Sequence, residues 1–181
     1  TKKEKSIVIY NGCDIKKYDP TIDRAAKRAA LDIDKDIMVV GNVASLVMFK
    51  GHIYLLEAAK KILEAFPNTV FMIAGRGKLE QELKNTAKQL GISGSVRFLG
   101  FREDIAELLK IMDIFVMPSI AEGMPLSIIE AMASRLPVIA TEVAGVPEII
   151  ENGVDGILIP PADPNALVVK IIELLKNREL A

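Results

Sequence analysis

Cysteine, histidine and tryptophan are nearly absent from this sequence of 181 residues. It contains one cysteine, Cys13, one histidine, His52, and no tryptophan. A single cysteine excludes an intrachain disulfide framework and favours a reducing compartment, so we expect a cytoplasmic protein. We interpret Cys13 as an inert, partly buried thiol and His52 as a residue that orients the start of a helix.

An excess of charge of one sign and long apolar runs are also missing. The formal net charge is −1, so we expect no nucleic-acid partner and no electrostatic attraction to an anionic membrane. No apolar run reaches the roughly 18 residues that a membrane-spanning helix needs. The nearest, "IAELLKIMDIFVMPSIA", is interrupted by Lys110 and Asp113. No signal peptide is recognisable, and because the first residue is Thr1 we expect a piece excised from a longer protein.

Short β-branched runs alternate with segments of helical period from residue 37 onward. Half of the residues are hydrophobic and 26% are charged, which is ordinary for one compact core. The pattern predicts strands over 37–43, 70–74, 96–100, 114–118, 137–141 and 156–160, and helices over 52–66, 78–90, 103–111, 125–134 and 165–177. The strands are apolar throughout rather than alternating, which is typical of a parallel sheet covered on both faces.

We therefore predict an α/β fold, a single Rossmann-like, doubly wound domain. Its sheet should have six mostly parallel strands in the order 3-2-1-4-5-6, with helices on both faces. Residues 1–36 fit this pattern poorly, and "KEKSIVIYNGCDIKKYDP" resembles one strand and a linker. We expect an interdomain segment over 1–36 and a binding domain over 37–181.

The predicted topology selects two loops as a binding site. Ligands of such sheets bind at the carboxyl ends of the strands where the strand order reverses, here after 37–43 and 114–118. The loop "ASLVMFKG" carries Lys50, and the loop "PSIAEGMP" carries Glu122. The second loop leads directly into a helix, whose N–H groups and positive end suit a phosphate. Lys50 can add a cation from the facing loop.

A second carboxylate, Glu130, follows Glu122 with seven residues between them. About two helical turns in, it lies too deep for the phosphate but near a sugar hydroxyl. Glu122, in front of the helix, can accept hydrogen bonds from another polyol. A diphosphate flanked by two sugars, a nucleotide-diphosphate sugar, matches this arrangement.

The segment "PSIAEGMPLSIIEAMASRLPVIATEVAGVPEIIENGVDGILIPPADPNAL" carries a family resemblance. With "FKGHIYLLEA", "IAGRGKLEQEL" and "VRFLGFREDI" in the expected order and spacing, it resembles the donor-binding half of a retaining glycosyltransferase of family 4, the group 1 glycosyltransferases. These enzymes have the GT-B fold, and this half is its C-terminal domain. The resemblance extends from "VIYNGCDIKKYDP" through "LLKN", nearly the whole chain.

The resemblance implies a role for each residue of the site. Glu122 and Lys50 would be catalytic, with Glu122 on the donor sugar and Lys50 on the diphosphate. Glu130 would bind the nucleotide ribose. The remaining donor-binding residues would lie in two places. Those by the phosphates and sugar would be Gly123, Met124, Leu126, Ser127 and Pro125, which has no N–H to give. Those around the base would be Phe101, Arg102 and Asp104.

One position departs from the family pattern. Members usually carry an arginine five residues before the lysine, and here that position is Ser45. Loss of this cation should weaken support for the departing diphosphate, on the order of 10²–10³ in rate. Whether Arg76 in "GRG" substitutes for the missing arginine is left open.

By resemblance, the parent enzyme transfers a hexosyl group from a UDP-, GDP- or ADP-sugar with retention, and needs no metal or other cofactor. The implied partners are a missing N-terminal acceptor-binding domain and a glycan or lipid-linked acceptor. The resemblance also implies that the parent enzyme is peripheral at a membrane and takes part in polysaccharide or glycolipid assembly. Two alternatives stay open, a non-catalytic nucleotide-sugar-binding module and a nucleotide-sugar epimerase. A dehydrogenase is disfavoured because the glycine fingerprint is missing.

Overall fold

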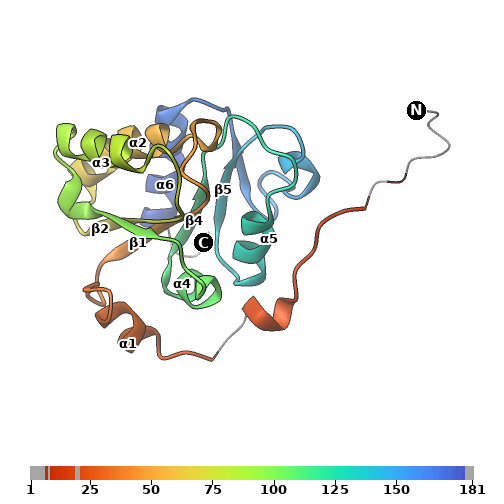
Figure 1. Ribbon diagram of the computed structural model, residues 1–181, viewed down its shortest axis with the longest axis horizontal. Coiled ribbons are helices and arrows are strands. Elements are labelled where there is room, and N and C mark those ends of the chain that lie inside the picture. The colour runs from red at the N-terminus through yellow and green to blue at the C-terminus, as the bar shows by residue number, and fades with distance from the viewer. Residues whose placement is uncertain (1–6, 8, 19–20, 178–181) are drawn as a thin grey trace.

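A computed structural model describes residues 7, 9–18 and 21–177, and Figure 1 shows its central sheet with helices on both sides. The sheet has the order β3-β2-β1-β4-β5-β6, and every neighbouring pair of strands is parallel. The strands are β1 (Met38–Val43), β2 (Thr69–Ala74), β3 (Val96–Gly100), β4 (Ile114–Met117), β5 (Val138–Thr141) and β6 (Ile157–Ile159). The predicted fold class and strand order are confirmed.

Successive strand residues point to opposite faces of the sheet, so each strand feeds two cores. Val40 and Phe71 pack in one apolar cluster with α2 (His52–Ala65), α3 (Glu80–Gln89) and α6 (Pro164–Lys176). Val39 and Met72 pack in the other with α4 (Ile105–Ile111) and α5 (Leu126–Ala133). Burial on both faces explains why the strand sequences are apolar throughout.

Helix ends follow the local sequence to within a few residues. Asp163 caps α6, because its Oδ1 accepts hydrogen bonds from the N–H groups of Asn165 and Ala166 at 2.9 and 3.0 Å. Pro125, expected in the first turn of α5, is instead its N-cap residue, with φ −72°. The shift of one position leaves Leu126 as the first helical residue.

Among the described residues before 37, the structure has no strand. Of the expected strand, Ile7, Ile9 and Tyr10 are exposed and belong to no strand, whereas residues 6 and 8 lie outside the described part. Instead, the described residues form a 3-10 helix, η2 (Ile15–Tyr18), and α1 (Arg24–Ala29). The helix α1 begins at Asp23, whose Oδ1 accepts a hydrogen bond from the N–H of Ala26 at 3.0 Å.

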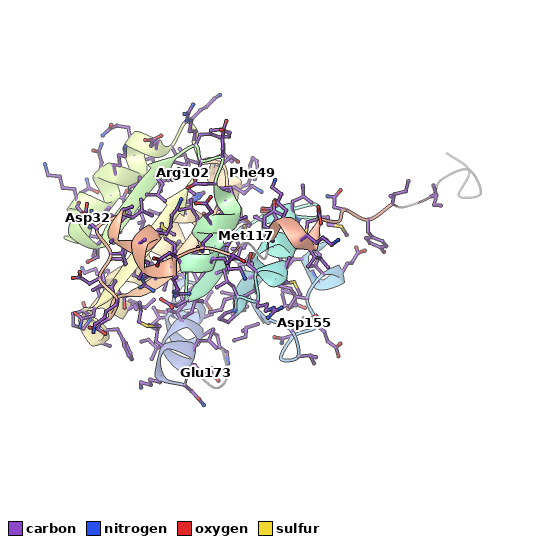
Figure 2. All side chains as sticks on the ribbon, turned by 90° about the horizontal axis from the view of Figure 1, so that it is seen from below. Asp32, Phe49, Arg102, Met117, Asp155 and Glu173 are labelled. Carbon is purple, nitrogen blue, oxygen red and sulfur yellow. The ribbon has the colours of Figure 1, made fainter. Side chains whose placement is uncertain are left out.

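The parallel arrangement brings the carboxyl ends of all strands to one edge of the sheet. Figure 2 shows Met117, the last residue of β4, near the middle of the molecule. The short 3-10 helices η3 (Met48–Lys50) and η5 (Val146–Glu148) lie in loops that leave this edge, and η4 (Ser93–Ser95) precedes β3. Within the described ranges, none of the helices is both long and apolar enough to cross a membrane.

Candidate functional site

The loops after β1 and β4 meet at the carboxyl edge of the sheet. The carbonyl oxygen of Phe49 accepts hydrogen bonds from the N–H of Ile120 at 2.8 Å and from that of Ala121 at 3.4 Å. Gly51 permits this approach, since its φ is +68° and a Cβ there would lie 1.9 Å from the carbonyl oxygen of Pro118. The convergence predicted from the topology is therefore present.

Lys50 and Glu122 form an ion pair across the two loops. The Nζ of Lys50 lies 2.7 Å from both carboxylate oxygens of Glu122, and the Oγ of Ser119 donates to one of them at 2.6 Å. The Glu122 side chain is only 5% exposed and that of Lys50 18%. Thr141 holds Ser119 from β5, because its hydroxyl donates to the Ser119 carbonyl at 2.5 Å. The two predicted catalytic residues thus lie in direct contact.

Unpaired backbone N–H groups run from Glu122 into the first turn of α5. Among the described residues no hydrogen-bond acceptor is found for the N–H groups of Glu122, Gly123, Met124, Leu126 and Ser127. The first two helical positions of α5 have no side-chain cap, because Pro125 occupies the N-cap. The loop after β5 supports this turn from behind, since a Cβ on Gly145 would lie 2.2 Å from the carbonyl oxygen of Gly123. Such a turn attracts a phosphate group.

Glu130, the fifth residue of α5, has a partner that the sequence did not indicate. The phenol of Tyr18 donates a hydrogen bond to one carboxylate oxygen of Glu130 at 2.5 Å. Tyr18 is 5% exposed, and burial, reinforced by Glu130, raises the pKa of its phenol. Tyr18 falls in the segment expected to be a strand and a linker, and no local periodicity marks it as buried.

Other residues of the N-terminal segment also lie along α5. The side-chain amide of Asn11 donates to the carbonyl oxygen of Met124 at 3.1 Å. The Cys13 sulfur lies 4.0 Å from the carbonyl oxygen of Ile129, and burial raises the pKa of this thiol. The expectation of a partly buried thiol is confirmed.

The residues expected around a base lie after β3, but two of them pair with each other. The Arg102 guanidinium donates two hydrogen bonds to Asp104, at 2.7 and 2.6 Å, and holds the pKa of that carboxyl well below its ordinary range. Lys27 of α1 adds a third at 2.6 Å. Phe101 is 60% exposed, with the guanidinium of Arg76 5.3 Å from its ring centroid. Phe101 therefore offers a flat, accessible ring.

Ser45 is exposed in the loop after β1, next to the "GRG" loop. The N–H of Leu46 donates to the carbonyl oxygen of Arg76 at 2.8 Å, which joins the two loops. The Arg76 side chain packs on Phe101. The suggestion that Arg76 replaces the missing cation stays a prediction.

His52 lies directly behind the ion pair, in the first turn of α2. Its Nε2 lies 3.0 Å from Oδ1 of Asn42, whose side-chain amide donates to the carbonyl oxygen of Val116 at 2.8 Å. Burial, and then the charge of Lys50, lower the pKa of His52 to about 4. A neutral His52 therefore ties α2 to β1 and β4, in line with the orienting role that we expected.

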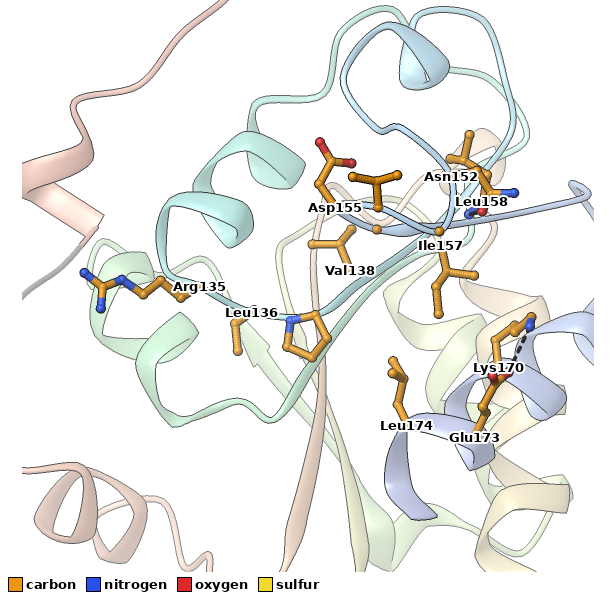
Figure 3. A pocket seen from close by; sticks show the side chains of 14 residues that line it. Arg135, Leu136, Val138, Asn152, Asp155, Ile157, Leu158, Lys170, Glu173 and Leu174 are labelled. Atoms are coloured by element: carbon orange, nitrogen blue, oxygen red, sulfur yellow. Dashed lines mark hydrogen bonds and ion pairs between the residues drawn. The ribbon is translucent and has the colours of Figure 1, made fainter. Parts of the chain in front are cut away.

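Two hollows in the molecule lie away from these residues. One of about 560 Å³ opens at the amino ends of β5 and β6 and is shown in Figure 3 with the ion pair of Lys170 and Glu173. Another of about 640 Å³ lies beside α1. The candidate site lies instead at the opposite edge of the sheet, where the carboxyl ends of the strands meet. Within the described ranges no three histidine, cysteine, aspartate or glutamate side chains converge as metal ligands.

The chain is similar in sequence to known proteins. A family model described as glycosyl transferases group 1 matches residues 23–181. The chain is 35% identical over 177 residues to the Escherichia coli UDP-Gal:alpha-D-GlcNAc-diphosphoundecaprenol alpha-1,3-galactosyltransferase, covering 96% of this chain and 46% of that protein. The chain thus spans about half the length of the curated relatives that it matches.

Solved structures resemble the chain over almost its full length. The Anabaena protein Alr3699/HepE, crystallised in complex with UDP, matches with a TM-score of 0.90 and 30% identity, over 98% of this chain and 50% of that one. The C-terminal domain of the group 1 family protein LpcC from Francisella tularensis matches with a TM-score of 0.83 and 28% identity, over 93% of this chain and 90% of that one.

Proposed function

The chain belongs to the group 1 glycosyltransferases, and we propose that it forms the half of such an enzyme that binds the nucleotide-sugar donor. Similar proteins support this, because the Anabaena protein was solved both with UDP and with UDP-glucose. The Francisella match is itself a C-terminal domain. We infer that the acceptor site lies on a further domain of the parent protein.

The ion pair of Lys50 and Glu122 beside the amide-rich turn carries the proposal. A nucleotide-sugar places a diphosphate next to a sugar, and transfer develops negative charge on the first and positive charge on the second. Lys50 and the N–H groups that open α5 suit the diphosphate, whereas the carboxylate of Glu122 suits the sugar ring. Because both carboxylate oxygens of Glu122 hold Lys50, the diphosphate competes with this carboxylate for the ammonium group.

We further propose transfer of a hexosyl group with retention, to a glycan or lipid-linked acceptor. The bond between the anomeric carbon and the diphosphate oxygen breaks, and the acceptor hydroxyl oxygen bonds to that carbon on the same face. The hydroxyl proton passes to the leaving diphosphate. In this scheme Glu130 binds the ribose, Phe101 stacks on the base, and no metal is required.

Titration calorimetry of the 181-residue chain with UDP, GDP and ADP tests donor binding. We expect one of them to bind, and Glu130→Ala to weaken it about tenfold, since a hydrogen-bonding partner of the ribose is lost. Glu122→Gln should preserve the affinity, because this side chain serves the sugar and its change frees Lys50 for phosphate. No heat with any of the three, on folded protein, would refute the proposal.

Lys50→Met tests the diphosphate contact against a matched lysine. We expect affinity to fall about tenfold or more when this charge-assisted contact is lost. Lys60, exposed on α2, serves as the control, and Lys60→Met should bind like the wild type. Equal losses in both variants would point to net charge rather than a specific contact.

A non-catalytic donor-binding module is the second candidate, and Ser45 favours it, because the family's usual arginine is missing there. Restoring the cation as Ser45→Arg in the full-length parent separates the two functions. A large gain in transfer rate indicates an enzyme that lacks one stabilising charge. Unchanged, undetectable transfer together with nucleotide binding indicates a module.

A further inference from the structure

The N-terminal segment of the described chain reaches the site through one buried tyrosine. Tyr18 ends η2, is 5% exposed, and donates its phenol hydrogen to Glu130 at 2.5 Å. The hydroxyl of Ser134, the C-cap residue of α5, lies 3.2 Å from the Tyr18 carbonyl oxygen and 2.9 Å from the Glu130 carbonyl oxygen, and its one hydrogen is shared between them. Tyr18 is therefore attached to α5 by both its side chain and its backbone.

Only one of the two carboxylate oxygens of Glu130 is used in this contact. In the part of the chain that the structure describes, the other oxygen has no hydrogen-bond partner. Glu130 is half-buried, and its second carboxylate oxygen is not among the buried unpaired polar atoms of the described residues, so this oxygen is accessible. A glutamate side chain on a helix samples several rotamers, and a buried donor on one oxygen selects among them.

We propose that Tyr18 is a positioning residue for the nucleoside part of the donor, acting through Glu130. The phenol holds one carboxylate oxygen, so that the other is directed at a ribose hydroxyl before the ligand arrives. This inference rests on the proposed function, and it adds that the segment before the binding domain contributes to nucleotide affinity.

The apolar role of Tyr18 can be separated from its hydroxyl. Its ring belongs to the cluster formed by α4, α5 and one face of the sheet. Tyr18→Phe keeps that ring and removes only the hydrogen-bond donor. Glu130 is not buried deeply enough to be left without water in this variant, so the fold should be retained.

Calorimetry on the 181-residue chain, with whichever of UDP, GDP and ADP binds most tightly, measures the effect. We expect Tyr18→Phe to raise Kd about three- to tenfold, the cost of fixing one flexible side chain on binding. Tyr10→Phe is the matched control from the same segment, 60% exposed, and should leave Kd unchanged. Urea unfolding of each variant verifies that it is folded.

Two further measurements exclude a general structural effect. In a Glu130→Ala background, Tyr18→Phe should change Kd by less than twofold, because the residue through which it acts is gone. With the 2′,3′-dideoxy form of the same nucleoside diphosphate, Tyr18→Phe should also have no effect. Equal losses on both ligands would overturn the inference, since they indicate a distorted site rather than an oriented glutamate.

The inference and the proposed function fail in different ways. If the wild-type chain binds none of the three diphosphates, both are overturned. If a diphosphate binds and Glu130→Ala weakens it, but Tyr18→Phe binds as tightly as the wild type or more tightly, the inference alone is overturned.

Discussion

At the scale of single residues, the site depends on charges that are buried but paired. Glu122 would be costly to bury alone, and Lys50 and Ser119 supply its partners. Arg102 and Asp104 are partly exposed and also pair with each other, and their expected contact with a base stays a prediction. His52 differs from these charged residues, because it is buried next to Lys50 and its imidazole remains neutral.

Stability should fall as the pH is lowered from about 6.5 to 4, through His52. Unfolded histidine takes up a proton near its ordinary pKa of 6.5, whereas folded His52 does so only at about 4. The unfolded state therefore binds more protons in this window, and about 3 kcal/mol of unfolding free energy is lost across it. Urea unfolding at several pH values measures the change.

The variant His52→Gln separates this titration from that of the carboxylates. As His52 is the only histidine, the variant should lose less stability over the same pH range than the wild type does. Parallel pH profiles for the two proteins would contradict the assigned role of burial.

At the scale of elements, tight loops bring the charges together. The loop that contains η3 passes close enough to the end of β4 that only glycine fits at position 51. The N-terminal turn of α5 is supported in the same way by Gly145. Strand order brings these loops to the same edge, and their close backbone approach brings Lys50 within reach of Glu122.

Gly51→Ala should destabilise the protein by more than about 2 kcal/mol. The left-handed backbone alone costs roughly 1–2 kcal/mol for alanine, and the Cβ would also collide with the carbonyl oxygen of Pro118. Gly91 is the matched control, because its φ is +76° but no atom lies within 4 Å of a Cβ there. Chemical denaturation of both variants should show the smaller loss in Gly91→Ala. Equal losses of stability in Gly51→Ala and Gly91→Ala would mean that the loops after β1 and β4 can move apart without a cost in free energy.

At the scale of the whole molecule, the sheet has a core on each face, and the N-terminal segment completes one of them. Tyr18 and Ile33 are both buried in the cluster under α4 and α5. Arg24 of α1 also pairs with Asp113, with 2.6 Å between the guanidinium nitrogen and Oδ1. Residues before 37 thus pack in the same core as residues after it, and the expected boundary at residue 37 stays a prediction.

Stepwise truncation should lower stability in two stages. Removal of residues 1–20 takes away Tyr18, and we expect a loss of about 2 kcal/mol for one large buried side chain. Removal of 1–35 also takes away Ile33 and α1, and should cost clearly more. Thermal or urea unfolding measures both, and unchanged midpoints would show that the predicted boundary at residue 37 is a true domain boundary.

Much of the fold and part of the site were predictable from local pattern. Each of the six strands lies within about one or two residues of its predicted range, because apolar runs and helical periods are local properties. The convergence of Lys50 and Glu122 followed from strand order alone. The predicted strand before residue 11 failed, since "SIVIY" has strand propensity but Ile7 and Ile9 pair with no strand of the described chain.

The amino-acid sequence by itself determined the strands, their order in the sheet and the edge at which we propose that a ligand binds, because burial on two faces and the handedness of βαβ connections leave few arrangements. Only the tertiary structure decided that Lys50 pairs with Glu122 and that Tyr18 lies on Glu130. Those contacts join residues more than 70 positions apart, and a short-range sequence pattern does not predict which distant side chains will meet.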